Sequence, residues 1–261
     1  MRKPVLSFAA GLLLAAASLH ASAAGLLATV KARGTVTVAM EGTYPPFNFK
    51  DQKTGQLAGY DVDVANLLAK KLGVKAQFVA TEWPAILAGL AAKRYDMIVS
   101  QVTVNPVREQ SFDFSTPYTY SSPMLILRKD DNSNYRSLAD LKGKRVGAGQ
   151  GSVYEQQARA AGGIDVKSYP AAPENLADLA AGRIDAALND SLITAWLLKT
   201  TKLPVKAGAR VGKVERAAVT FRKGDPEFKA AINKALAEAT ADGSLAAISV
   251  KWFGIDVSKA P

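Results

Sequence analysis

One arginine and the residues before it have the types that bind a carboxylate. Residues 100–108 read Ser-Gln-Val-Thr-Val-Asn-Pro-Val-Arg. Asn105 and Pro106 are typical of a helix cap and a first helical position, which places Arg108 one turn into a helix, near its positive end. The helix dipole does not stabilise a cation at that end of the helix. An arginine there could instead bind an anion, because a guanidinium pairs bidentately with a carboxylate. Arg108 is therefore either an anion-holding residue or an ordinary surface arginine.

A second group of residues supplies a complementary site. Residues 149–155 read Gly-Gln-Gly-Ser-Val-Tyr-Glu, in which Ser152 and Glu155 predict a capping box after a glycine-rich turn around Gly151. Free amides at such a helix start can hold a carboxylate, and the same motif also serves as a purely structural cap. Asp190 follows a predicted buried strand and could accept hydrogen bonds from an ammonium group, or it could cap the next helix.

Two aromatic residues stand on stiff backbone. Tyr44 precedes two prolines, and Trp83 precedes Pro84. Rings held in this way give apolar contact at low entropy cost, although a hydrophobic core would use them equally well. These residues could bind an anion, accept hydrogen bonds from an ammonium group and pack two aromatic rings, or aromatic walls, against a side chain. A free α-amino acid requires all three kinds of contact.

The scarcity of histidine and the absence of cysteine limit the catalytic and metal-binding chemistry that is possible. The only histidine is His20, which falls in the N-terminal segment considered next, and cysteine is absent from the chain. This composition excludes Ser-His-Asp and Cys-His catalysis and metal sites built on histidine or cysteine. Carboxylate, lysine, arginine and tyrosine chemistry stays open, but we predict no catalytic residue, no metal and no cofactor.

The N-terminus has the organisation of a secretory signal peptide. Arg2-Lys3 precedes an apolar run over residues 5–19, and Ala21-Ser22-Ala23 is a typical cleavage sequence. The run is short and rich in alanine for a membrane span, which needs about 20 strongly apolar residues, although an uncleaved anchor is the alternative. We predict that residues 1–23 are removed and that the exported, periplasmic protein begins near Ala24.

The formal net charge of +10 raises the question of nucleic-acid binding. The lysines and arginines are scattered, however, without long basic blocks or interleaved aromatic residues. Export would also separate the chain from nucleic acid. We therefore predict a generally basic surface and no nucleic-acid partner.

Predicted strands alternate with predicted helices along most of the chain. The expected strands are residues 34–40, 74–79, 97–99, 145–148, 166–169, 184–188 and 217–221. The expected helices begin at Pro84, at Ser152, at Leu176 and at Leu192, and a short last helix ends at residues 251–254. Two further helices would be capped by aspartate, one that runs from Asp61 to Gly73 and one that begins at Asp225-Pro226. This alternation predicts an α/β fold with mostly parallel sheets covered on both faces.

One short segment of the sequence recurs in the second half of the chain, and we call this match the internal echo. Residues 90–96, Leu-Ala-Ala-Lys-Arg-Tyr-Asp, match residues 179–185, Leu-Ala-Ala-Gly-Arg-Ile-Asp. Continuing the match sets Ser100 opposite Asn189 and Gln101 opposite Asp190. Because ligands of open α/β sheets lie beyond the carboxyl ends of strands, two related lobes would present polar groups from equivalent places.

Several motifs in fixed order carry a family resemblance. They are residues 41–47 (EGTYPPF), 59–63 (GYDVD), 103–108 (TVNPVR), 113–118 (DFSTPY), 141–147 (LKGKRVG) and 182–186 (GRIDA). The chain from its predicted start resembles the polar amino-acid-binding proteins of ABC importers (solute-binding family 3). Within that family it is most similar to the cystine-binding proteins, through residues 41–47, 101–103 and the Lys-Trp-Phe-Gly tail at 251–254.

The resemblance implies a two-lobed periplasmic-binding-protein fold of type II. Each lobe would be a mostly parallel sheet flanked by helices. Lobe 1 would comprise residues 24–117 and 218–261, and lobe 2 residues 122–212. Residues 118–122 and 213–217 would form a two-segment hinge that closes on the ligand.

The resemblance also implies residue roles. The ligand carboxylate would be held by Arg108, helped by groups of Thr103, Ser152 and Val153, of which Val153 can offer only its amide. Asp190 would take the ammonium group, with the backbone of Gln101. The implied site is completed by the aromatic walls, an acidic group at the far end and the neighbouring polar and turn positions: Tyr44, Trp83, Glu41, Ser100 and Gly151.

The implied function is that of an extracytoplasmic binding protein. It would capture a polar L-amino acid, with cystine as first candidate and a basic amino acid or glutamine as alternatives, and deliver it as a monomer to the membrane permease of an ABC importer. The alternative class is a periplasmic cyclohexadienyl or arogenate dehydratase-like enzyme, because the same fold hosts such enzymes. Asp190 would be an awkward neighbour for a dicarboxylate substrate.

Overall fold

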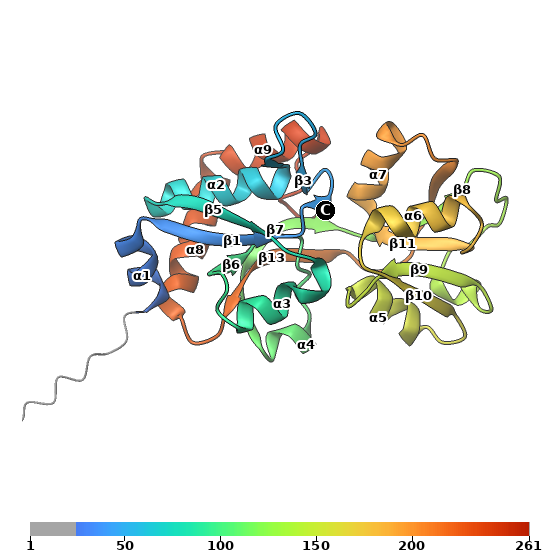
Figure 1. The fold of residues 1–261 in the computed structure, drawn as a ribbon, viewed down its shortest axis with the longest axis horizontal. Helices are drawn as coiled ribbons and strands as arrows, with labels where there is room; N and C mark the ends of the chain where they lie inside the picture. Colours follow the sequence, from blue (N-terminus) through green and yellow to red (C-terminus); the bar gives the residue numbers. More distant parts are fainter. Residues whose placement is uncertain (1–24, 261) are drawn as a thin grey trace, which may run out of the picture.

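The computed structural model describes residues 25–260 and forms two α/β lobes side by side (Figure 1). Each lobe is built around its own five-stranded sheet. The predicted signal peptide lies outside the described residues. Within residues 25–260, no helix is both long enough and apolar enough to cross a membrane.

The sheet of lobe 1 has four of its five strands running in one direction. Across the sheet the strands are β5 (Lys75–Ala80), β1 (Thr35–Met40), β6 (Met97–Ile98), β13 (Glu215–Arg222) and β7 (Phe112–Ser121). β1 is parallel to β5 and β6, whereas β13 is antiparallel to both β6 and β7. The last three residues of β1 are buried in succession, as expected for a strand covered on both faces.

The sheet of lobe 2 has the same pattern. Its strands are β10 (Asp165–Tyr169), β9 (Arg145–Gly149), β11 (Ala186–Asp190), β8 (Pro123–Arg128) and β12 (Val205–Arg210). β9 is parallel to β10 and β11, and β8 is antiparallel to both β11 and β12. The mostly parallel α/β architecture predicted from the sequence is therefore confirmed in both lobes.

The two matching segments, residues 90–96 and 179–185, form the same hydrogen-bonding arrangement in their two lobes. Asp96, just before β6, accepts a hydrogen bond from the amide of Thr37 in β1 at 2.7 Å. Asp185, just before β11, accepts the amide of Arg145 in β9 at 2.8 Å. In each lobe the aspartate also pairs with an arginine, Arg33 in lobe 1 and Arg145 in lobe 2. The two matching segments therefore occupy equivalent positions in the two sheets.

Helices cover both faces of each sheet. They are α1 (Leu26–Arg33), α2 (Tyr60–Leu72), α3 (Trp83–Ala91), α4 (Pro106–Glu109), α5 (Val153–Ala160), α6 (Ala172–Ala180), α7 (Ser191–Thr200), α8 (Pro226–Ala241) and α9 (Ser244–Phe253), with the short 3-10 helix η1 (Leu138–Leu141). A small sheet of β2 (Thr43–Tyr44), β3 (Asn48–Lys50) and β4 (Leu57–Ala58) follows β1.

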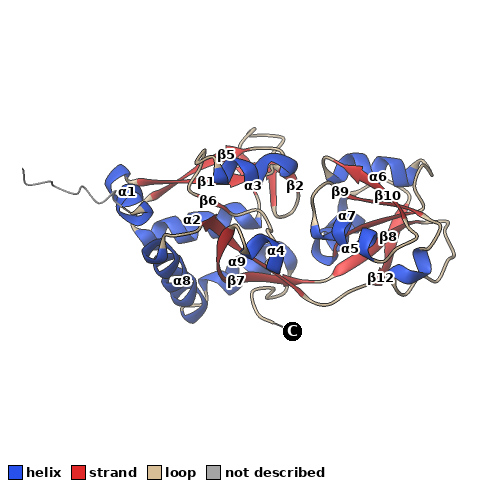
Figure 2. Ribbon diagram, turned by 90° about the horizontal axis from the view of Figure 1, so that it is seen from below, coloured by secondary structure: helices blue, strands red, loops and turns tan. Residues whose placement is uncertain are grey.

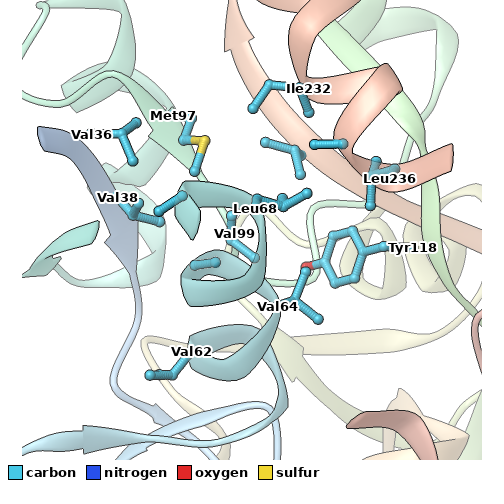
Figure 3. Close-up of a cluster of buried hydrophobic side chains, with 14 of the residues drawn as sticks. Val36, Val38, Val62, Val64, Leu68, Met97, Val99, Tyr118, Ile232 and Leu236 are labelled. Carbon is cyan, nitrogen blue, oxygen red and sulfur yellow. The ribbon is translucent and has the colours of Figure 1, made fainter. Parts of the chain in front are cut away.

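The largest core lies in lobe 1. Val64 and Leu68 of α2 pack with Ile232 and Leu236 of α8 and with Val38 of β1 (Figure 3). The C-terminal helices therefore return to lobe 1, as the sequence predicts. The opposite face of that sheet packs against α3. In lobe 2, α5 covers one face of the sheet, and α6 covers the other.

The chain crosses between the lobes twice. β7 leads through Ser122 into β8, and residues 211–214 lead from β12 into β13. The two crossings lie side by side, because Glu215 at the start of β13 pairs with Ser121 at the end of β7 (Figure 2).

Three local expectations need correction. Helix α2 begins at Tyr60 after Gly59, so Asp61 lies inside its first turn and does not cap it. Asp225 stands at the N-cap of α8, but its carboxylate accepts the amide of Leu26 at 3.0 Å instead. α6 begins four residues earlier than the apolar pattern indicates, because Pro173 occupies its first turn. The αL glycine predicted to end α2, Gly73, is present.

Candidate functional site

A cavity between the lobes gathers most of the residues predicted for the site. Glu41, Tyr44, Trp83, Ser100, Gln101, Thr103 and Arg108 line it from lobe 1, and Ser152 and Val153 line it from lobe 2. Gly151 and Asp190 do not line it, but each bonds to a residue that does. The wall from lobe 2 also includes Tyr154, Asn175 and Asn189, which the sequence reasoning did not assign to the site.

Arg108 is a buried cation that forms no ion pair with a carboxylate of residues 25–260. Its amide bonds to the Asn105 side chain at 2.9 Å, as the predicted cap requires, and only 6% of the residue is exposed. The guanidinium donates to the carbonyls of Thr103 at 2.9 Å and Gly151 at 3.3 Å and lies over the ring of Trp83. Burial lowers the pKa of Arg108 to about 10, so the group is charged at neutral pH.

A buried charge is costly unless an opposite charge meets it. Among the described residues, no carboxylate lies within ion-pair distance of Arg108. Glu215 acts on it only at longer range, raising its pKa against the effect of burial. Arg108 is thus suited to an anion that enters the cavity.

The start of α5 departs from the predicted capping box by one residue. Ser152 accepts the amide of Glu155 at 3.1 Å, as expected. The Glu155 carboxylate, however, accepts the amide of Gly151 at 2.7 Å rather than that of Ser152, which donates to the Gly149 carbonyl. Two of the amides expected to be free are therefore occupied. Among the described hydrogen bonds none uses the amide of Val153, which lines the cavity.

Asp190 fills one of the two roles that the sequence left open for it, that of a helix cap. It is the N-cap of α7 and accepts the Leu192 amide at 2.6 Å. Its other carboxylate oxygen accepts hydrogen bonds from the hydroxyls of Ser121 and of Tyr154, the latter at 3.2 Å. Burial raises the pKa of Asp190, and these hydrogen bonds oppose that rise. The carboxylate lies one side chain behind the cavity wall.

Glu41 and Tyr44 give the cavity wall an acidic and an aromatic group. The Glu41 carboxylate accepts the Thr43 hydroxyl at 2.8 Å. Burial raises the pKa of Glu41 to about 7, and the negative charge of Glu174 on α6 adds to this rise. Tyr44 stacks on Phe47 and donates to the Asn189 side chain at 2.7 Å, which joins the two lobes directly.

A buried network behind Gln101 escaped the sequence reasoning. Asp61 is fully buried, and its carboxylate accepts hydrogen bonds from Gln101 at 2.7 Å, Tyr118 at 2.9 Å and Asn48 at 2.7 Å. Burial raises the pKa of Asp61 to about 6, and the three hydrogen bonds act in the opposite direction. Gln101 has a φ of 52°, in the left-handed region that non-glycine residues rarely adopt. The network holds this strained residue at the cavity wall.

The arrangement is suited to binding a zwitterion. It offers a buried cation, a carboxylate behind the wall, a second carboxylate in the wall and two aromatic rings. In the described part of the chain, no three His, Cys, Asp or Glu side chains gather into a group that could hold a metal ion.

Comparison with known proteins gives a consistent picture. The family model of bacterial extracellular solute-binding proteins, family 3, matches residues 36–255. The L-cystine-binding protein TcyJ of Escherichia coli is 43% identical over 90% of this chain and 88% of its own length. The L-cystine-binding protein TcyA of Bacillus subtilis is 41% identical over 90% and 87%. An ancestral arginine-binding protein bound to arginine superimposes with a TM-score of 0.80 at 36% identity, over 85% of this chain and 99% of its own.

Proposed function

Because the chain belongs to family 3 of the bacterial extracellular solute-binding proteins, we propose that it captures a polar L-amino acid, first of all L-cystine, in the interlobe cavity. It would then present the loaded form to the membrane permease of an ABC importer. The protein is a solute-binding protein of the amino-acid ABC transporter type. It is not an enzyme of the dehydratase class, since the relatives described above are binding proteins.

The observation that carries the proposal is the buried guanidinium of Arg108, which meets no carboxylate among the described residues but faces the cavity. A ligand carboxylate would pair with it, assisted by Thr103, Ser152 and the amide of Val153. The ligand ammonium would bind at Asp190 and the Gln101 backbone. A buried polar group left without a hydrogen-bond partner would weaken binding by about 1–3 kcal/mol. This penalty favours a ligand that carries both an ammonium and a carboxylate group.

Capture would proceed by closure of the lobes. Residues 118–122 and 213–217 would act as the hinge, with lobe 1 formed by residues 24–117 and 218–261 and lobe 2 by residues 122–212. Two direct hydrogen bonds between the lobes, from Tyr44 to Asn189 and from Arg108 to Gly151, support this proposal. Opening would break both hydrogen bonds.

The choice of L-cystine draws on the two cystine-binding relatives and on Glu41. An ionised carboxylate at the far end suits a ligand with a second ammonium group, a property shared by cystine and the basic amino acids. The similarity to an arginine-binding structure keeps a basic ligand as the second candidate. Glutamine, which carries no second charge, is the weakest of the three.

Isothermal titration calorimetry of the exported protein with L-cystine, L-arginine, L-lysine and L-glutamine tests the proposal. We expect L-cystine to bind with the lowest Kd. Tighter binding of L-arginine would identify a basic amino acid as the ligand and leave amino-acid capture intact, whereas no heat with any amino acid would refute amino-acid capture.

Size-exclusion chromatography with light scattering tests the expected monomer. Mass spectrometry of the exported protein tests cleavage before Ala24 and periplasmic location.

A further inference from the structure

We propose that the N-terminus of α6 and the side chain of Asn175 form a subsite for the second α-amino-acid group of the ligand. The ligand class would then be an α,α′-diamino dicarboxylic acid, which carries an ammonium and a carboxylate at both ends. L-cystine is one member of this class. The inference rests on the proposed function and specifies the chemistry of the far end of the cavity.

Helix α6 begins at the cavity wall. Pro170, Ala171 and Ala172 all line the cavity. Ala171 is the N-cap residue, and no side chain of the described residues caps the helix. Among the described hydrogen bonds none uses the amides of Ala172 or Glu174. Helix N-termini with free amides attract carboxylates, because the amide dipoles point toward the ligand.

Asn175 provides an independent sign of a ligand at this place. Its side chain lines the same cavity, and the residue is 2% exposed. Oδ1 is buried against Gly147 of β9 without a hydrogen-bond partner. Among the described hydrogen bonds none uses Nδ2, the donor that this side chain could offer to a ligand. The fold makes room for this amide, since a Cβ on Gly147 would lie 2.1 Å from Asn175 Oδ1. Buried amides are almost always hydrogen-bonded in proteins, so an unmet one in a cavity wall indicates a polar partner from outside the chain.

The equivalent position in lobe 1 shows that folding does not require this amide. Helices α3 and α6 have the same length, precede the equivalent aspartates Asp96 and Asp185 by the same spacing, and carry proline in the first turn. In this match Asn175 corresponds to Ile86, a fully buried core residue. An apolar side chain thus satisfies the architecture in lobe 1, while lobe 2 keeps a polar one facing the cavity.

The charges nearby complete a second zwitterion site. Glu41 lines the cavity, and the negative charge of Glu174 raises its pKa. Strand β2, which follows Glu41, contacts α6, so Glu41 lies close to the start of that helix. An ammonium group would therefore meet Glu41, while the adjoining carboxylate would meet the α6 amides. A basic amino acid would satisfy the acidic group but leave the helix amides unmet.

Titration calorimetry with matched disulfides tests the ligand class. The mixed disulfide of L-cysteine and cysteamine equals L-cystine without its second carboxylate, and the cysteine-free protein cannot exchange with it. We expect the mixed disulfide to bind at least about 30-fold more weakly than L-cystine. Affinities within threefold of each other would overturn the subsite while leaving amino-acid capture intact. Absence of binding by every amino acid and both disulfides would instead refute the proposed function and the subsite together.

Two variants test the protein side. The extended backbone of Ala171 suits an aspartate cap, so Ala171→Asp should raise Tm and weaken L-cystine binding at least about 30-fold, with little change for the mixed disulfide. Ala177→Asp, which adds the same charge at an exposed position of α6, is the control and should bind L-cystine normally. Asn175→Leu, which copies the apolar character of Ile86, should retain the fold and weaken L-cystine about tenfold. Wild-type L-cystine affinity in both Ala171→Asp and Asn175→Leu would contradict the subsite.

Discussion

Lobe 1 and lobe 2 share one strand order, but they equip the cavity between them with different groups. Lobe 1 contributes charged and aromatic side chains, notably Arg108, Glu41, Tyr44 and Trp83. Lobe 2 contributes the starts of helices α5 and α6 and, behind its wall, the capping carboxylate of Asp190. The shared topology decides where groups meet, because the carboxyl ends of both sheets face the cavity. The residue types at those ends decide which ligand charges each lobe can hold.

The equivalent starts of α3 and α6 show the difference most clearly. Both helices carry proline in the first turn and lack a side-chain cap. Lobe 1 places the indole of Trp83 at this point, beneath the Arg108 guanidinium, whereas lobe 2 places Ala172 there. The large ring makes a wall, and the small residue leaves backbone amides open to the cavity.

The comparison predicts its largest effect at the cation of lobe 1. Replacing Arg108 by Ala should weaken amino-acid binding by at least about 100-fold, since removal of one partner of a buried ion pair costs about 3–5 kcal/mol. Tm without ligand should not fall much, because a buried charge without a carboxylate partner is removed. Calorimetry and thermal unfolding measure both quantities. Arg94→Ala, at an exposed arginine of lobe 1, is the control, and an affinity of Arg108→Ala within about tenfold of wild type would refute the assignment.

The carboxylate of lobe 2 should give the next largest effect. Asp190→Asn retains a good helix cap but loses the charge, so binding should weaken about 10- to 100-fold while Tm changes little, because charge-assisted hydrogen bonds contribute about 1.5–3 kcal/mol. Calorimetry is again the measurement. An unchanged Kd would place the ligand ammonium elsewhere in the cavity.

Glu41 should make binding depend on pH. Its pKa of about 7 means that the carboxyl is largely protonated at pH 6 in the unliganded protein. A ligand with a second ammonium requires the ionised form, so binding releases a proton. Affinity should rise up to about tenfold per pH unit below pH 7 and level off above it. Glu41→Gln should remove most of this dependence between pH 5.5 and 8, and an equally steep profile in that variant would contradict the role of Glu41.

The same raised pKa has the opposite consequence for stability. The folded state holds the Glu41 proton more tightly than the unfolded state, so its contribution to stability is present below about pH 4.5 and is lost as pH rises through 7. Glu41→Gln should therefore gain Tm relative to wild type at pH 8 more than at pH 4.5. An equal difference in Tm at the two pH values would contradict this linkage.

The smallest effect is expected at the direct contact between the lobes. Tyr44→Phe keeps the ring but removes the hydrogen bond to Asn189, which is worth about 0.5–1.5 kcal/mol. Affinity should fall about two- to tenfold, mainly through faster ligand release in stopped-flow measurements. Tyr135→Phe, which removes a hydroxyl of lobe 2 outside both the cavity and the proposed hinge, should show no change.

Much of the fold could be predicted because it rests on local signals. The alternating strands and helices, the return of the C-terminal helices to lobe 1 and the Asn105 and Ser152 caps all follow from residues close in sequence. The internal echo of residues 90–96 and 179–185 located the equivalent carboxyl ends of β6 and β11. Ser100 and Gln101, which follow β6, line the cavity at the first of these ends.

The residues that escaped prediction have partners far along the chain. Asp61 looks like a cap for its own helix, yet its carboxylate binds Gln101 and Tyr118, 40 and 57 residues away. Asn175 looks like an ordinary polar residue of an amphipathic helix, until the fold places it against Gly147 and the cavity. Residue type alone does not distinguish a cap from a buried network, because the same carboxylate or amide can serve either.

The sequence by itself determined the α/β lobes, the absence of histidine and cysteine chemistry outside His20, and the residue types suited to a zwitterion. Only the tertiary structure decided which amides at the helix starts are free and that Asp190 caps α7 while lying behind the cavity. It also decided that Arg108 is buried without a carboxylate beside it in the described part of the chain. Local patterns follow from short-range sterics and hydrogen bonding. Burial and pairing depend on distant segments, and in this protein they follow from the approach of the two lobes.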